Sequence, residues 1–350
     1  MIKNYFLLGS LLCSMGAFSQ STVWKHTGWE ARISDKGYLE QIIFKDKKGN
    51  DTIPFFRSGQ GNCGPSFYAE REGKLQCPRW TALGNQLFRT EVEGVECELA
   101  YLSTEKYPAI QLTLTNRSTT PYQPQKAGLK LGIDTYMDKY PDWFDKYFPT
   151  LMRNEKTHFY GYMQTPRGHT LALVCEQPIA SWSVDYNLGY QDPAPHWFMG
   201  HRIESLNLDL LNCLPLPPRH PQHLYELKQG ESKSWVIAFV NIGKLSDLEK
   251  GISDIVEIPL IDLSRTSYTS GEEATFEIWG EQPQVEVVTD NGMLLPLQTA
   301  RIKAGRTQVK VILPRPGLYQ VNVKSKGKIA EAVLTVHPLS LIHISEPTRL

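Results

Sequence analysis

The stretch at residues 88–118 reads FRTEVEGVECELAYLSTEKYPAIQLTLTNRS. Apolar and polar residues alternate in it, most regularly from Ala109 to Thr115. A period of two places successive side chains on opposite faces of a β-strand, so this stretch predicts three strands. The pattern continues on both sides. Residues 29–53 alternate around a turn at 35–37 and break at 48–50, which is typical of hairpins.

These strands predict an all-β protein whose residues 20–243 form a large antiparallel two-sheet sandwich, or supersandwich. At residues 244–256, apolar side chains spaced three and four apart predict a short linker helix. Residues 257–338 again alternate, with turn signals between short strands. Their length and spacing predict a small Ig-like β-sandwich without the disulfide of antibody domains.

The two ends of the chain differ from this pattern. Residues 1–19 combine an early lysine, an apolar run and small residues before the cleavage position, which predicts a signal peptide. We therefore expect an exported protein. Residues 339–350 break the β pattern, and all but the last match the translation of bases that resemble a transposon-end sequencing adapter. We expect this tail to be non-native and the natural protein to continue beyond Pro338.

Composition excludes several classes of partner. The formal net charge is zero and no basic or acidic block stands out, which argues against nucleic acid and against a membrane surface. The apolar run of the signal peptide is too short to span a bilayer, so no membrane span is expected. No phosphate-binding loop, GxSxG elbow or HExxH motif is present, and the sequence predicts no cofactor.

Cysteines leave two interpretations open. Cys63 and Cys77 flank a glycine-rich region and could form one disulfide after export, whereas buried thiols acting as small apolar residues are the favoured alternative. Cys13 follows Leu12, where lipoprotein processing needs a small residue, so lipidation is disfavoured. No cysteine or histidine spacing fits zinc well, and a zinc site built from His196, His201, His220 and His223 is the disfavoured alternative.

The strongest candidate site is the segment at residues 131–163, where carboxylates and aromatic rings are interleaved. Aromatic faces stack on sugar rings and carboxylates accept hydrogen bonds from hydroxyls, so carbohydrate contact is one interpretation of this mixture. A structural loop or domain interface is favoured slightly over it, and a catalytic carboxylate pair is the disfavoured alternative. The candidate contacts here are Asp134, Tyr136, Tyr140, Asp142, Trp143 and His158.

Residues 180–212 offer a similar mixture, from which Trp182 and Asp185 are further candidate carbohydrate contacts. No catalytic residue is assigned in either segment. A rival interpretation makes the sandwich itself a sugar-active enzyme of the mutarotase type, with a pair such as His158 and Glu155.

The order of parts resembles the front half of exported carbohydrate-active enzymes of Gram-negative bacteria. In that family a β-supersandwich and a small β module precede an (α/α)6 catalytic barrel. The segments at residues 132–163 and 200–231 carry the likeness. The resemblance implies a periplasmic or outer-surface protein whose catalytic residues lie in the missing C-terminal barrel. It also implies an oligo- or polysaccharide substrate that the sandwich helps to position, for a hydrolase or a lyase. A glycan-binding or adhesion protein with more β modules is the second rival.

Overall fold

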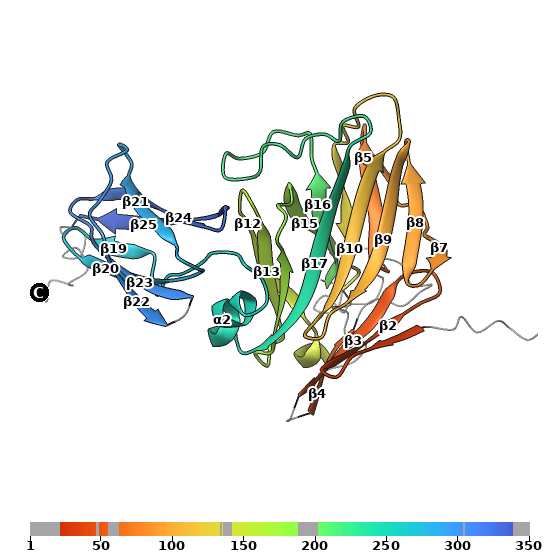
Figure 1. Cartoon of the computed structure of the whole chain (residues 1–350), viewed down its shortest axis with the longest axis horizontal. Coiled ribbons are helices and arrows are strands. Elements are labelled where there is room, and N and C mark those ends of the chain that lie inside the picture. Colours follow the sequence, from red (N-terminus) through yellow and green to blue (C-terminus); the bar gives the residue numbers. More distant parts are fainter. Residues whose placement is uncertain are drawn as a thin grey trace, which may run out of the picture.

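The structure is a computed structural model that describes residues 22–46, 49–54, 63–133, 135, 142–187, 202–303 and 305–338. Nearly all of the regular secondary structure in the described residues is β-strand in largely antiparallel sheets, which confirms the predicted all-β fold (Figure 1). The predicted signal peptide and the predicted non-native tail lie outside the described residues.

Three antiparallel sheets precede residue 244. The largest has the order β12-β13-β14-β17-β10-β9-β8-β7, with strands Phe148–Asn154, Phe159–Gln164, Thr170–Cys175, Ser232–Gly243, Pro108–Asn116, Val95–Ser103, Leu87–Val92 and Thr81–Gly84. A five-stranded sheet has the order β15-β16-β11-β5-β6, with strands Ser181–Asn187, Arg202–Leu211, Lys126–Lys130, Ser66–Arg71 and Lys74–Gln76. A third sheet, β1-β2-β3-β4, adds Thr22–Lys25, Trp29–Ile33, Leu39–Asp46 and Gly49–Pro54 to the predicted two.

The sandwich core follows from the alternation seen in the sequence. Ile110, Leu112 and Leu114 of β10 are buried in one apolar cluster with side chains of β17 such as Trp235 and Ile237. Leu206, Leu208 and Leu210 of β16 enter the same cluster from the five-stranded sheet. Burial of alternate side chains from both sheets is the main favourable contribution to folding of such a sandwich.

The eight-stranded sheet is also covered on its outer face. Strand β14 is buried along its whole length, because Leu171 and Leu173 face the sandwich core while Ala172 and Val174 face a second cluster. That cluster includes Leu248 and other side chains of helix α2 (Leu248–Ser253), which follows the 3-10 turn η2 (Leu245–Asp247). The helix lies within the predicted linker, between the sandwich and the C-terminal strands (Figure 1).

The C-terminal strands form two four-stranded sheets around their own apolar cluster. We call residues 257–338 the module; the boundaries themselves stay a prediction. One sheet is β18-β20-β23-β22, with Leu260–Asp262, Glu273–Trp279, Arg306–Ile312 and Gln298–Lys303. The other is β19-β25-β24-β21, with Ser267–Thr269, Lys328–His337, Gly317–Ser325 and Gln284–Thr289. Strands β19 and β25 form a parallel pair.

Other sequence predictions have simple outcomes in the described residues. No disulfide joins Cys63 to Cys77 or any other pair there. Cys97 and Cys175 are buried thiols, as the favoured alternative expects, whereas Cys77 and Cys213 are exposed. Within the same residues no helix is long and apolar enough to cross a membrane, and no group of three or more His, Cys, Asp or Glu side chains could hold a metal ion.

A glycine substitution tests the packing between β11 and β16. Gly128 lies at the register shift between these strands, and a Cβ there would overlap the carbonyl oxygen of Leu208. We expect Gly128→Ala to lower the free energy of unfolding by about 3 kcal/mol, because backbone atoms would have to move. Urea unfolding measures the effect. The control is Gly28→Ala, where no atom lies within 4 Å of the added Cβ. Equal stability of the two variants would contradict the close approach of β11 to β16.

Candidate functional site

The described structure contains only part of the site predicted from sequence. Asp134, Tyr136 and Tyr140 lie outside the described residues. Asp142 and Trp143 belong to the 3-10 turn η1 (Asp142–Asp145), where the backbone is described and these two side chains are not. Those five residues therefore stay predictions as carbohydrate contacts.

Asp185 is placed on a continuous polar surface, which we call the polar sheet face. Strand pairing sets Ser181 opposite Asp209 and Ser183 opposite Asn207 on β15 and β16. The neighbouring strands β11 and β5 add Lys130 and Tyr68 to this row. The face is polar because alternate residues of β16 enter the core as leucines, leaving the residues between them on the other side of the sheet. Its members are Tyr68, Lys130, Ser181, Ser183, Asp185, Ser205, Asn207 and Asp209.

At one end of the polar sheet face, Asp185 is held by two donors. Lys130 Nζ lies 2.5 Å from Asp185 Oδ2, and Asn207 Nδ2 donates to Asp185 Oδ1 at 2.9 Å. Ser205 Oγ donates to Asn207 Oδ1 at 2.9 Å. The Asp185 side chain keeps 37% of its surface exposed. This end is therefore ordered, and its exposed group is the Asp185 carboxylate, since Lys130 is mostly covered and Asn207 and Ser205 are buried.

The other end is closed. The Asp209 carboxylate accepts hydrogen bonds from the hydroxyls of Tyr68 and Ser181, and Asn212 Nδ2 donates to Ser181 Oγ at 3.1 Å. Asp209 is only 2% exposed. Burial and the Asp209 carboxylate raise the pKa of Tyr68 well above its ordinary value, so its hydroxyl stays protonated and donates. Asp209 thus orders the polar sheet face from inside.

Trp182 does not share a face with Asp185. It lies three residues before Asp185 on β15, and alternation places it on the opposite side of the strand. Because β15 is the edge of its sheet, the Trp182 side chain keeps 39% of its surface exposed. Trp182 and Asp185 are close in sequence, but their side chains lie on opposite sides of the edge strand β15.

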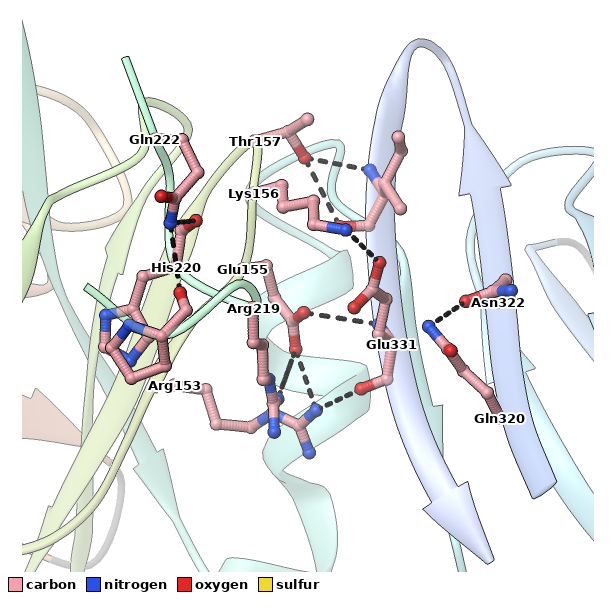
Figure 2. Close-up of polar contacts among 12 residues, drawn as sticks. Arg153, Glu155, Lys156, Thr157, Arg219, His220, Gln222, Gln320, Asn322 and Glu331 are labelled. Atoms are coloured by element: carbon pink, nitrogen blue, oxygen red, sulfur yellow. Dashed lines mark hydrogen bonds and ion pairs between the residues drawn. The ribbon is translucent and has the colours of Figure 1, made fainter. Parts of the chain in front are cut away.

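Glu155, one of the pair of the mutarotase-type rival, lies at the contact between sandwich and module (Figure 2). His158, the other, follows Thr157 of the same contact. Arg153 donates to Glu155 Oε1 from Nε at 3.0 Å and from Nη2 at 2.7 Å, and Arg219 Nη2 donates to the same oxygen at 3.2 Å. The second oxygen accepts the backbone N–H of Glu331 at 3.2 Å. Glu155 is 1% exposed, so this carboxylate is neutralised and enclosed rather than poised for catalysis.

These contacts also cover the first part of β25, which β19 leaves unpaired because it pairs only with residues 335–337. The N–H of Ile329 donates to Thr157 Oγ1 at 2.8 Å, and the carbonyl of Glu331 accepts from Arg153 Nη2 at 2.6 Å. The Glu331 side chain pairs with Lys156 at 2.9 Å (Figure 2). Side chains of the sandwich therefore take the place of a neighbouring strand, which satisfies an edge that would otherwise be open to pairing with another chain. We call this set of contacts the junction.

His158 does not reach a surface that a glycan could contact, because its side chain is 0% exposed. Thr157 Oγ1 lies 3.1 Å from Nδ1, and Nε2 has no hydrogen-bond partner among the described residues. Burial, helped by nearby Lys328 and Arg153, lowers the pKa of His158 to about 3. His158 is thus a buried neutral ring of the junction, which favours neither the predicted carbohydrate contact nor the role that the mutarotase-type rival gives it.

Comparison with known proteins supports the fold of the chain. No protein-family model and no curated protein matches the sequence. Among solved structures, the polysaccharide lyase BACCELL_00875 matches 90% of this chain with a TM-score of 0.62 and 13% sequence identity. The chain spans 47% of that lyase. At this identity the match shows the fold alone, and it covers sandwich, linker and module together.

Two further matches are weaker. An aldose 1-epimerase-like protein from Escherichia coli K12 matches 63% of this chain and 98% of its own at 12% identity, with a TM-score of 0.38. The Lin-41 filamin domain matches 23% of this chain and 93% of its own at 12% identity, with a TM-score of 0.22. TM-scores this low support no conclusion about the sandwich or the module.

Sequence reasoning missed most of the polar sheet face. Tyr68 and Asp209 are 141 residues apart in the chain, so nothing local announces their contact. One signal was present, because Ser205, Asn207 and Asp209 alternate with leucines in a single strand. Strict alternation of hydrogen-bonding side chains marks a strand whose second face is polar and ordered.

Removing the charge of Glu155 tests the junction. We expect Glu155→Gln to lower the free energy of unfolding by about 2 kcal/mol, since Arg153 and Arg219 lose their common counter-charge. The effect stays below that of a fully buried pair because Arg219 is half-exposed. Thermal unfolding and limited proteolysis of the linker measure it. The exposed Glu286→Gln variant is the control, and equal behaviour of both variants would contradict the role of Glu155.

His158 gives a pH dependence with a defined sign. Its folded pKa of about 3 lies below its ordinary 6.5, so between these values the unfolded chain binds a proton that the folded chain does not. Stability from this group is complete above pH 6.5 and falls by ~1.4 kcal/mol per unit as the pH drops toward 3. Urea unfolding of His158→Gln should show a shallower loss over this window. The exposed His223→Gln variant is the control; a wild-type slope in His158→Gln would refute the assignment.

Proposed function

We propose that this chain is the non-catalytic N-terminal part of an exported glycan-degrading enzyme, a glycoside hydrolase or a polysaccharide lyase. In this proposal the sandwich positions an oligo- or polysaccharide, and the catalytic residues belong to a further domain of the same protein. Its support from comparison is the fold match over 90% of this chain to a polysaccharide lyase, of which the chain spans 47%.

The observation that carries the proposal is the open end of the polar sheet face. Sugar hydroxyls both donate and accept hydrogen bonds, so a glycan surface needs fixed donors beside fixed acceptors. Lys130 carries ammonium hydrogens beyond the one directed at Asp185, and Asp185 provides acceptor lone pairs on β15 of the same sheet, while buried Asn207 fixes the carboxylate. Strands hold such groups more rigidly than loops do, which reduces the entropy lost on binding.

The geometry of the described residues favours binding over chemistry at this face. Asp209 is enclosed by two hydroxyl donors, and Asp185 is paired with an ammonium group at 2.5 Å. Neither carboxylate is arranged as the proton donor that cleavage of a glycosidic bond requires. We therefore assign positioning to this surface and leave the acid and base to the further domain. The carbohydrate contacts predicted from sequence at Asp134, Tyr136, Tyr140, Asp142 and Trp143 stay part of this proposal.

Affinity electrophoresis in gels containing neutral and acidic polysaccharides tests this proposal. We expect Lys130→Met and Asp185→Ala each to weaken retention on the bound polysaccharide about 10-fold, the loss of one or two polar contacts to charged groups. Lys74→Met is the matched control, because Lys74 lies on β6 of the same sheet and is exposed. Unchanged affinity of both site variants, in proteins that melt like wild type, would overturn the assignment of this face.

A further inference from the structure

The outer face of one module sheet carries a group of apolar side chains. On the sheet β19-β25-β24-β21, strand pairing sets Val333 opposite Gln320 and Gln320 opposite Val288. A bridge pairs Val288 with Leu294, and residues paired in this way share a face of the sheet. Leu318, two residues before Gln320 on β24, lies on the same face. We call Val288, Leu294, Leu318 and Val333 the apolar patch.

The apolar patch is exposed and lies among uncharged neighbours. Leu294, Leu318 and Val333 keep 61%, 55% and 50% of their surface exposed. On the same face Gln320 lies beside Val333, and Thr335 lies opposite Leu318. Single exposed apolar residues are common, whereas a contiguous group on one face marks an interaction site. The centres of protein interfaces are also depleted of charged residues, so this face has the composition of an interface.

The apolar patch continues an interface that is already formed. Residues 329, 331 and 333 alternate on one face of β25, and the sandwich covers the first two through the junction. Glu331 pairs across the sheet with Asn322, and Asn322 accepts a hydrogen bond from Gln320 at 2.9 Å beside the apolar patch (Figure 2). A partner that covered the patch would therefore extend the contact between sandwich and module along the same sheet face.

The direction of β25 indicates which partner can reach the apolar patch. The strand begins at the junction and ends at His337, and Val333 lies five residues before Pro338. At about 3.3 Å per residue this separation is ~16 Å. A folded domain of about 100 residues has a radius of gyration of roughly 13 Å. A domain that follows Pro338 in the same protein therefore reaches the patch without a long linker.

The size of the apolar patch favours such an attached domain over a second copy of this chain. Four partly exposed aliphatic side chains present much less surface than the roughly 800 Å² per partner of a standard interface. Two separate molecules also lose translational and rotational freedom when they associate. A covalently attached domain has already lost most of this freedom, so a small apolar contact is sufficient to hold it.

We propose that the apolar patch is the docking face for the further domain of the same protein. That domain covers Leu318 and Val333 with an apolar, uncharged surface of its own and lies next to the junction. The inference rests on the proposed function and adds a contact surface to it. No residue of the polar sheet face takes part, so glycan retention through that face can fail or hold independently of docking.

Hydroxyl-radical footprinting of this chain and of the longer natural protein tests the proposal. In this chain Leu318 and Val333 should be oxidised readily, as exposed Ile312 on the other module sheet is. In the longer protein we expect oxidation of Leu318 and Val333 to fall to the low rate of buried Val321, while Ile312 keeps its rate.

Two outcomes of footprinting would overturn the docking face. One is equal oxidation of Leu318 and Val333 in both proteins. The other is protection that appears in this chain alone as its concentration rises, because a second copy would then be the occupant. A longer protein without activity on any polysaccharide contradicts the proposed function instead, and the footprint of the patch is independent of that assay.

Threonine variants complete the test. Leu318→Thr and Val333→Thr keep good strand formers at exposed positions, so this chain should melt as wild type. In the longer protein each should speed proteolytic cleavage after Pro338 roughly 3- to 10-fold, since a weaker apolar contact leaves the domain undocked more often. Ile312→Thr is the matched control and should be cleaved as wild type. Wild-type cleavage of Val333→Thr would overturn the proposal even if Leu318→Thr fails to fold.

Discussion

The arrangement of the two β units depends on a buried carboxylate. Glu155 lies almost fully enclosed between two arginines and a backbone N–H of β25. Enclosing a lone carboxylate would cost several kcal/mol, so the contact persists only while Arg153, Arg219 and Glu331 keep their positions together. A single residue thereby links a turn of the sandwich, the loop before β17 and the edge of the module.

Apolar packing supports the same arrangement from another direction. The eight-stranded sheet is apolar on both faces near β14 and β17, which antiparallel sheets with one solvated face do not need. Helix α2 covers the outer face, and Leu260 at the start of the module joins the same cluster. The polar contacts of Glu155 are directional and orient the module relative to the sandwich. The apolar cluster buries the surface that stabilises this orientation, so both are needed to fix the position of the module.

Local patterns were sufficient for the fold and insufficient for the site. Alternation at Ala109–Thr115 depends only on neighbours in sequence, and it predicted the strand and its buried face correctly. The helix in the linker was also visible, since its spacing is local. Asp185 was recognised as a polar candidate, but Tyr68 and Asp209 come together only through the order of strands in the sheet. The interpretation of Glu155 and His158 as a catalytic pair has the same limit, because it uses only their proximity in sequence. Their chemistry is that of a catalytic pair, and only the three-dimensional contact with the module shows that the first is enclosed and the second buried.

The carboxylates described above are of two types, enclosed and exposed, and the difference matters for the proposed glycan binding. Asp209 and Glu155 are satisfied by donors inside the protein, and they order the polar sheet face and the junction respectively. Asp185 is held by two donors and keeps surface exposed. The open carboxylate loses little conformational entropy when it binds a ligand, because the enclosed carboxylates already hold the surrounding side chains in place. If the proposed function holds, a glycan would meet groups that the protein itself has already ordered.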